Sequence, residues 1–114
     1  MGWNVEVTDE CRTWLEELNE ADFDSVDYSV DLLIEDGPQL DHPHSSKVNG
    51  SRHNQRRELR TQSGGRPLRT LYAFDPLRKA ILLLGGDKTE RRSLVREDQL
   101  YDKHLDELRK EGKL

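Results

Sequence analysis

The first third of the chain carries one strand pattern and two helical patterns. Residues 3–7 alternate between apolar and polar positions, a period of two that predicts a short, half-buried strand. Thr8 can then cap a helix, because its side-chain oxygen can accept a hydrogen bond from the first helical turn. Over residues 22–36 apolar positions recur every three or four residues, which predicts a second helix ending at Gly37. The two helices are expected to pair antiparallel, with their acidic residues facing away from the apolar side.

The middle of the chain has the pattern of a long loop followed by strands. Residues 37–55 lack periodicity and are rich in Pro, His, Ser, Asn and Gly, so we expect a loop that touches a short strand near Lys47. Three strand patterns follow, over residues 56–61, 67–74 and 79–84. The last is almost entirely apolar, which indicates a strand near the sheet centre with both faces covered. Gly85 and Gly86 are expected to end it, and residues 95–110 predict a final helix.

These elements follow the order β-α-α-β-β-β-α, which predicts an α+β fold in a single domain over residues 1–114. Short turns join the consecutive strands, so the sheet should be small and mostly antiparallel. We expect the helices to pack against one face of this sheet. The other face is then left to the basic residues of the strands.

Charge is divided unevenly along the chain, although the formal net charge is only −5. Residues 1–46 carry a net charge of −12, residues 47–96 carry +9, and residues 97–114 carry −2. This asymmetry is typical of a protein with one surface for a polyanion, but acidic helices pairing with basic strands would give the same counts. No apolar run approaches the roughly 18 residues of a membrane span, and the N-terminus lacks a secretory pattern. With one cysteine, Cys11, we expect a cytoplasmic protein.

Arg69 is the basic residue whose position needs an explanation. It lies between apolar residues in an inner strand, where a guanidinium is costly to desolvate without an anionic partner. Strand alternation places Glu58 and Arg60 on one side of the neighbouring strand and Arg57 on the other, and Glu58 is the nearest acid. Arg69 is therefore either half of a structural ion pair or a clamp for a phosphate. Lys88, which follows the central strand, could lie beside it and add a point charge.

Five segments between residues 50 and 88 read Gly-Ser-Arg-His-Asn (50–54), Glu-Leu-Arg (58–60), Gly-Arg-Pro-Leu-Arg (65–69), Tyr-Ala-Phe-Asp-Pro (72–76) and Ala-Ile-Leu-Leu-Leu-Gly-Gly-Asp-Lys (80–88). In these segments the chain resembles the HigB-like branch of the RelE/ParE toxin superfamily. A Leu-Tyr-Asp-x-His-Leu string over residues 100–105 also resembles this branch. Elsewhere the resemblance is one of element order.

The resemblance implies the toxin half of a bacterial toxin–antitoxin pair, cleaving messenger RNA, usually on the ribosome. Arg69 is similar to the strand arginine that contacts the scissile phosphate, and Lys88 matches the position of a second cation. Arg56 and Arg57 fall where such toxins carry basic residues along the RNA path. Glu58 departs from RelE, which has a lysine there, although glutamate is usual in this branch.

A tyrosine that stacks near the reacting nucleotide in RelE falls here at Leu94, which offers no phenol. The resemblance therefore leaves this stacking role to Tyr72, Tyr101 or His53, or to no residue at all. His104 is expected to be exposed or lightly packed.

The implied reaction is a metal-independent cut in which the RNA 2′-hydroxyl attacks the adjacent phosphorus and expels the 5′-oxygen. Arg69 and Arg57 could stabilise the phosphorane, and Lys88 could stabilise or protonate the leaving oxygen. Glu58 could accept the 2′-proton or could orient the arginines. Further RNA contacts are expected from the remaining basic residues, namely Lys47, Arg52, His53, Arg56, Arg60, Arg66 and Arg91.

Histidines 42, 44 and 53 lie in one polar loop and raise the question of a metal site. Structural zinc sites commonly use closer constellations to which Cys or carboxylates are added, so loop polarity accounts for these residues and no metal or cofactor is predicted.

Two other functions remain open: a non-catalytic ParE-type toxin that binds DNA gyrase, and a nucleic-acid-binding module without catalysis. The set of Arg56, Arg69 and Lys88, if it converges on one sheet face, favours RNA cleavage, because a protein that only binds another protein has no evident use for such cations. The expected partners are messenger RNA on the ribosome and a helix-turn-helix antitoxin, with no membrane.

Overall fold

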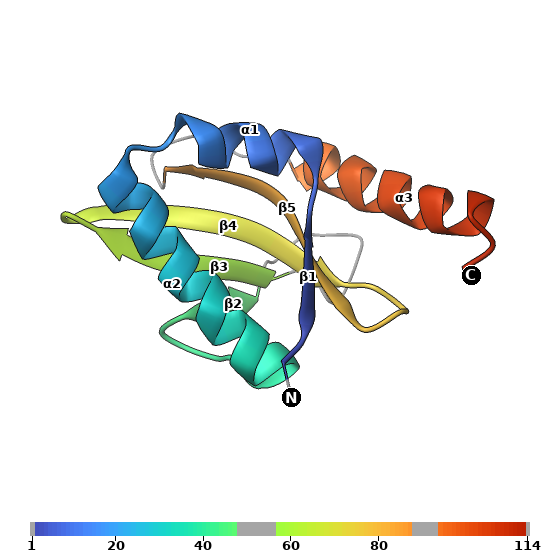
Figure 1. Ribbon diagram of the computed structural model, residues 1–114, viewed down its shortest axis with the longest axis horizontal. Coiled ribbons are helices and arrows are strands. Elements are labelled where there is room, and N and C mark those ends of the chain that lie inside the picture. Colours follow the sequence, from blue (N-terminus) through green and yellow to red (C-terminus); the bar gives the residue numbers. More distant parts are fainter. Residues whose placement is uncertain (1, 48–56, 88–93, 114) are drawn as a thin grey trace.

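The computed structural model describes residues 2–47, 57–87 and 94–113, which form a five-stranded sheet with helices on both of its faces (Figure 1). In chain order the elements are β1 (Asn4–Val7), α1 (Asp9–Glu17), α2 (Glu20–Asp36), a 3-10 turn (Gly37–Gln39), β2 (Ser45–Lys47), β3 (Arg57–Ser63), β4 (Arg66–Phe74), β5 (Lys79–Asp87) and α3 (Leu94–Lys110). The α+β class and the predicted order are confirmed, and β2 is the short strand expected near Lys47.

The strands lie in the order β1-β5-β4-β3-β2, with β1 parallel to β5 and every other pair antiparallel. Gly64 and Gly65 join β3 to β4, and both have positive φ angles, which suits the tight turn between twisted strands. Asp75 shapes the turn from β4 to β5, because its Oδ1 accepts hydrogen bonds from the backbone N–H groups of Leu77 and Lys79. Short turns therefore fix the register of the three long strands.

The prediction that Gly85 and Gly86 end the last strand is wrong, since β5 continues to Asp87. The Trp14 ring of α1 lies directly against Gly85, where a Cβ atom would overlap it. Gly86 is paired with Arg69 in β4. The glycines thus give room to large side chains on both sides of a continuing strand instead of breaking it.

The placement of α3 differs from the expectation that all helices share one face. α1 and α2 pack over one face, where the core includes Leu33 of α2 and Leu82 of β5. α3 packs over the opposite face, where Leu100 and Tyr101 join Ile81 in a second core cluster. The physical reason is the apolar run of β5, because successive residues point to opposite faces and both faces require cover.

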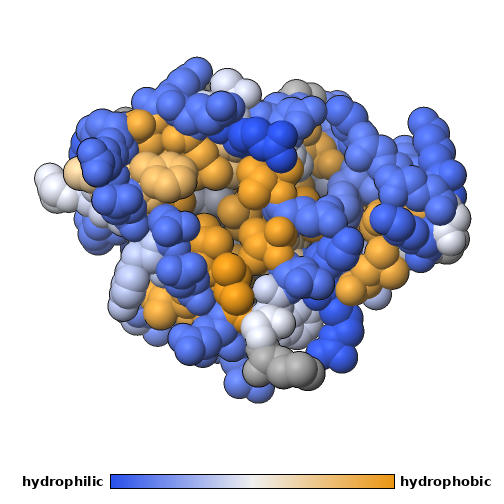
Figure 2. All heavy atoms as spheres, in the orientation of Figure 1, coloured by the Kyte–Doolittle hydropathy of each residue, from blue (hydrophilic) through white to orange (hydrophobic). Residues whose placement is uncertain are grey.

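The acidic part of the chain lies on the side of α1 and α2. Between these helices and β1, apolar side chains gather in the middle of the face shown in Figure 2, with hydrophilic residues around them. They include Val5, Val7, Leu15 and Val30, which are only partly buried. Within the described ranges, no helix is both long enough and apolar enough to cross a membrane.

Thr8 offers a test of this arrangement, because its hydroxyl caps α1 and joins it to the sheet. Its Oγ1 accepts a hydrogen bond from Cys11 N at 3.1 Å and donates one to Leu83 O at 2.7 Å. We expect Thr8→Ala to lower the free energy of unfolding, measured in urea, by about 1–2 kcal/mol. Thr13→Ala removes an exposed hydroxyl of the same helix and should change the free energy of unfolding by less than about 0.5 kcal/mol. Equal effects of the two substitutions would contradict the capping role.

Cys11 provides a second test, of core packing. Its thiol is fully buried in α1, and burial raises its pKa to about 12. We expect the native protein to react with a thiol reagent at pH 8 at least tenfold more slowly than the protein unfolded in urea, because the reactive species is the thiolate. Equal rates in the two states would show that the thiol is accessible.

Candidate functional site

The centre of the candidate site is an ion pair between Arg69 of β4 and Glu58 of β3. Glu58 is paired with Leu71 and Arg60 is paired with Arg69, so Glu58 lies diagonally from Arg69 on the same face of the sheet. The Glu58 Oε1 contacts the Arg69 Nε directly. Arg69 is 7% exposed, while the Glu58 side chain is 23% exposed, so solvent reaches the pair from the glutamate side.

Arg60 joins this pair as a second guanidinium. It lies directly opposite Arg69 on the neighbouring strand, and its side chain is half-buried. On the other side of Arg69 the paired residue is Gly86, which leaves space for a large side chain in an inner strand. Two cations and one carboxylate therefore meet on the α3 face, with a net charge of +1. Such a group can bind a phosphate through charge-assisted hydrogen bonds.

Three other predicted residues lie on the opposite face, the one covered by α1 and α2. Arg57 donates from Nε to Ser45 Oγ at 2.8 Å, and its Nη2 lies 3.6 Å from an Asp41 carboxylate oxygen. Lys47 is paired with Arg57 and is exposed. Arg66 pairs with Asp22 at 2.9 Å.

Arg60 and Arg69 therefore share one face of the sheet, and these three residues lie on the other. The sheet separates Arg57 from the Arg69 site, so a shared phosphorane contact for the two arginines does not fit this geometry. Strand alternation is the physical reason, because Arg57 directly precedes Glu58 in β3.

Five predicted residues lie outside the described ranges, namely Arg52, His53, Arg56, Lys88 and Arg91. The end of β5 is described: Asp87 is paired with Leu68, one residue from Arg69. Asp87, the last described residue before Lys88, therefore belongs to β5, the strand that borders the candidate site.

The tyrosines considered for stacking are both buried. Tyr72 is fully enclosed, and its hydroxyl is 2.6 Å from Ser45 Oγ. Tyr101 of α3 donates a hydrogen bond to Phe74 O at 2.7 Å. Neither ring offers a face to a nucleotide in this arrangement.

The expectation that His104 is exposed or lightly packed is wrong. Its Nε2 lies 2.8 Å from Asp75 Oδ2, and the Asp75 side chain is completely buried. Because Asp75 also shapes the turn between β4 and β5, this contact and that of Tyr101 fix α3 to the end of the sheet. The spacing of Tyr101 and His104, three residues apart on one helix face, is the signal that could have indicated a shared docking role.

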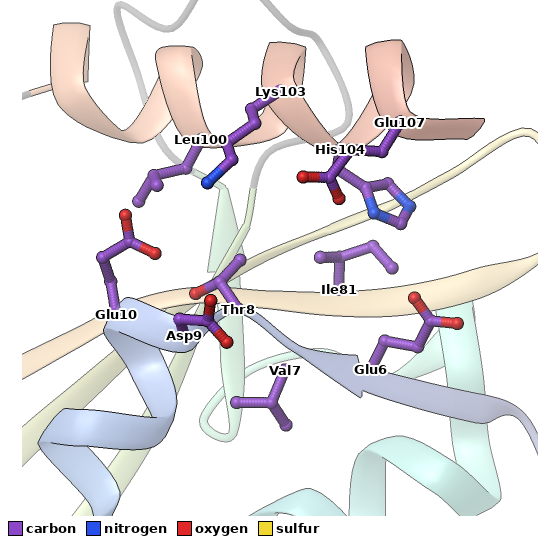
Figure 3. A pocket seen from close by; sticks show the side chains of 10 residues that line it. All are labelled: Glu6, Val7, Thr8, Asp9, Glu10, Ile81, Leu100, Lys103, His104 and Glu107. Atoms are coloured by element: carbon purple, nitrogen blue, oxygen red, sulfur yellow. The ribbon is translucent and has the colours of Figure 1, made fainter. Parts of the chain in front are cut away.

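A small hollow of about 140 Å³ lies between α3 and the junction of β1 with α1 (Figure 3). Its charged lining is mainly acidic, from Glu6, Asp9, Glu10 and Glu107, with Lys103 and His104 nearby. Acidic side chains repel phosphate, so this hollow does not suit an RNA backbone. Within the described part of the chain, no group of three His, Cys, Asp or Glu side chains is arranged to hold a metal.

Comparison with solved structures defines the class of fold. A double arginine-to-alanine mutant of Escherichia coli RelE in the free state superposes with a TM-score of 0.60 at 10% identity, covering 95% of this chain and 99% of that one. The RelE of Pyrococcus horikoshii, solved in complex with RelB, gives 0.58 at 17% identity, covering 80% and 100%. At such identities the likeness concerns the fold, which is RelE-like.

Sequence comparison defines the family. The family model described as Phage derived protein Gp49-like (DUF891) matches residues 13–112. Two Mycobacterium tuberculosis relatives have names that assign them as toxins. HigB2 is 36% identical over 112 residues, covering 92% of this chain and 55% of the relative. HigB3 is 48% identical over 79 residues, covering 69% and 68%. The chain belongs to the Gp49-like family, in the HigB-like branch of the RelE/ParE toxin superfamily, and spans about half the length of HigB2.

The Arg69 pair makes a prediction about stability. Glu58→Ala should lower the free energy of unfolding by about 3 kcal/mol, because it leaves a buried guanidinium without this carboxylate. Asp106→Ala removes the acid of an exposed pair with Arg109 and should cost less than about 1 kcal/mol. Urea denaturation measures both values.

The double variant Glu58→Ala/Arg69→Met provides the matched control, since it removes both charges. It should recover much of the stability lost in Glu58→Ala. If Glu58→Ala were as mild as Asp106→Ala, the pair would not be buried as described.

Proposed function

We propose that the chain is the toxin of a bacterial toxin–antitoxin pair and that it cleaves messenger RNA. The observation that carries the proposal is that Arg69 of β4 shares one face of the sheet with Glu58 and Arg60 of the neighbouring β3. An arginine needs a strong reason to be buried there, and recognition of a phosphate is such a reason. Membership of a family with HigB2 and HigB3 supports the toxin assignment.

In the proposed reaction the 2′-oxygen of the RNA loses its proton to water and attacks the adjacent phosphorus. The bond from phosphorus to the 5′-oxygen breaks, and that oxygen takes up a proton, which leaves a 2′,3′-cyclic phosphate and a 5′-hydroxyl. Arg69 contacts the phosphate and stabilises the charge that develops on the phosphorane. Glu58 acts as a positioning residue, because its carboxylate contacts Nε and fixes the plane of the guanidinium. Lys88 is proposed to stabilise or protonate the leaving oxygen, and the protein itself contributes no metal or cofactor to the reaction.

Arg60 is proposed to bind a phosphate next to the scissile one. It lies opposite Arg69, and cross-strand neighbours on one face are about 5 Å apart at Cβ. Two successive phosphates of an extended single strand could therefore contact the two arginines in turn. Contacts of this kind position the RNA and make its binding dependent on salt.

The proposal includes a site of action and a partner. Cleavage is expected to occur on messages held by the ribosome, in the cytoplasm. A helix-turn-helix antitoxin is the proposed partner, and the solved complex of RelE with RelB from Pyrococcus horikoshii shows that a protein of this fold assembles with RelB. Of the remaining basic candidates, Arg52, His53, Arg56 and Arg91 are proposed as peripheral RNA contacts. Lys47 and Arg66 lie on the face covered by α1 and α2, away from the Arg69 site.

Substitution of Arg69 tests the function. Arg69→Lys keeps the positive charge but loses the planar fork, and we expect it to reduce RNA cleavage by about 10²-fold or more and to abolish growth arrest on induction. Arg12→Ala, which removes an exposed arginine of α1, should leave growth arrest unchanged. Incorporation of labelled amino acids after induction measures translation, and circular dichroism checks folding.

A folded Arg69→Lys variant that still stops translation would refute the proposed site. Arrest of growth with gyrase-dependent DNA breaks and continued translation would instead identify a ParE-type toxin. Normal growth with the unaltered chain would identify a binding module without toxicity.

A further inference from the structure

A second hollow, of about 560 Å³, lies along the edge of β3 that extends past the first residue of β2. Its volume falls in the range of about 300–1,000 Å³ that is common for small-molecule sites. α2 contributes Asp24 and Tyr28 to its lining, the turn before β2 contributes His44, and β3 contributes Arg60 and Gln62. The Arg60 side chain lies on the opposite face of the sheet, with Arg69, so the open edge of β3 separates the hollow from the Arg69 site.

The edge of β3 presents backbone groups to this hollow. The N–H of Arg60 donates to His44 O at 2.8 Å, which shows that Arg60 turns its backbone polar groups outward. Alternate residues of an antiparallel strand share this direction, so Gln62 directs its N–H and C=O outward as well. The ladder with β2 ends at Leu59, and no strand in the described ranges pairs with this edge at Gln62.

This open edge of β3 is short, which favours binding of a flat ring over pairing with a peptide strand. An added strand requires a row of free donors and acceptors. Here Arg60 is already bonded to His44, and the turn at Gly64 follows soon afterwards. The outward backbone donor and acceptor of Gln62 match the hydrogen-bonding edge of a single nucleobase.

Tyr28 supplies a stacking surface at the rim of the same hollow. It is 64% exposed, an unusual position for a large aromatic residue. Nucleobases stack on such rings irrespective of their identity. The carboxylate of Asp24 repels phosphate but accepts hydrogen bonds from an exocyclic amino group, as carboxylates do from cytosine N4. These features fit an uncharged base whose phosphate stays outside, toward Arg60.

We propose that the hollow binds the base of a nucleotide next to the one cut at Arg69, with a preference for bases that carry an exocyclic amino group. The base stacks on Tyr28, and its polar edge bonds to Asp24 and to Gln62. This inference rests on the proposed function, since it takes RNA as the substrate. It makes the edge of β3 a determinant of which messages are cut.

Binding of mononucleotides to the purified full chain tests the site directly. Isothermal titration or chemical-shift changes should show that CMP, AMP and GMP bind more tightly than UMP, by about fivefold or more. Tyr28→Ala should weaken binding of CMP by roughly tenfold. Phe23→Ala, which removes the other exposed aromatic residue of α2, is the matched control and should leave binding unchanged. Equal binding of all four nucleotides, or equal losses in the two variants, would overturn the proposal.

Mapping of RNA 5′ ends after brief induction separates the failure of this inference from that of the proposed function. If messages stay intact with the unaltered chain, the proposed function fails. If they are cut, the nucleotide preference beside the cut should weaken in Tyr28→Ala and Asp24→Asn but not in Phe23→Ala, while cleavage itself continues. Cleavage with an unchanged preference in all three variants would overturn the inference alone.

Discussion

The ion pair of Arg69 and Glu58 is the interaction on which the site depends. A guanidinium in an inner strand loses most of its hydration, so the fold must supply a carboxylate at contact distance. Glu58 meets this requirement from the neighbouring strand, and Gly86 on the other side leaves the space that the arginine needs. The same contact that makes the buried charge tolerable also fixes its orientation, which is what recognition of a phosphate requires.

The two faces of the sheet differ in the helices that cover them and in the charge that they carry. α1 and α2 cover one face and carry 11 of the 23 acidic residues. α3 covers part of the other face and is fixed there by Tyr101 and His104. Arg69 and Arg60 lie on the α3 face, away from the acidic helices. The phosphates of the proposed RNA substrate are therefore expected on the α3 face. The apolar run of β5 makes this division possible, because it supports a core on each face.

Local patterns predicted much of this structure. The cap at Thr8, the second helix, the short turns between the strands and the position of Glu58 as the nearest acid to Arg69 all follow from rules of spacing and strand alternation. The contacts that were missed join residues far apart in the chain. The Trp14 ring explains why Gly85 continues a strand, and His104 reaches Asp75 across 29 positions. Strand alternation already placed the Arg57 and Glu58 side chains on opposite faces of the sheet. The role of Arg57 in stabilising the phosphorane came from the resemblance, and it conflicts with this geometry.

The central claim is that the Arg69 site cleaves RNA through attack by the neighbouring 2′-hydroxyl. The most direct test is the chemistry of the RNA ends produced within messages after brief induction of the chain. The account predicts new 5′-hydroxyl ends together with 2′,3′-cyclic phosphates. New 5′-phosphate and 3′-hydroxyl ends, or messages that remain intact while growth stops, would contradict it.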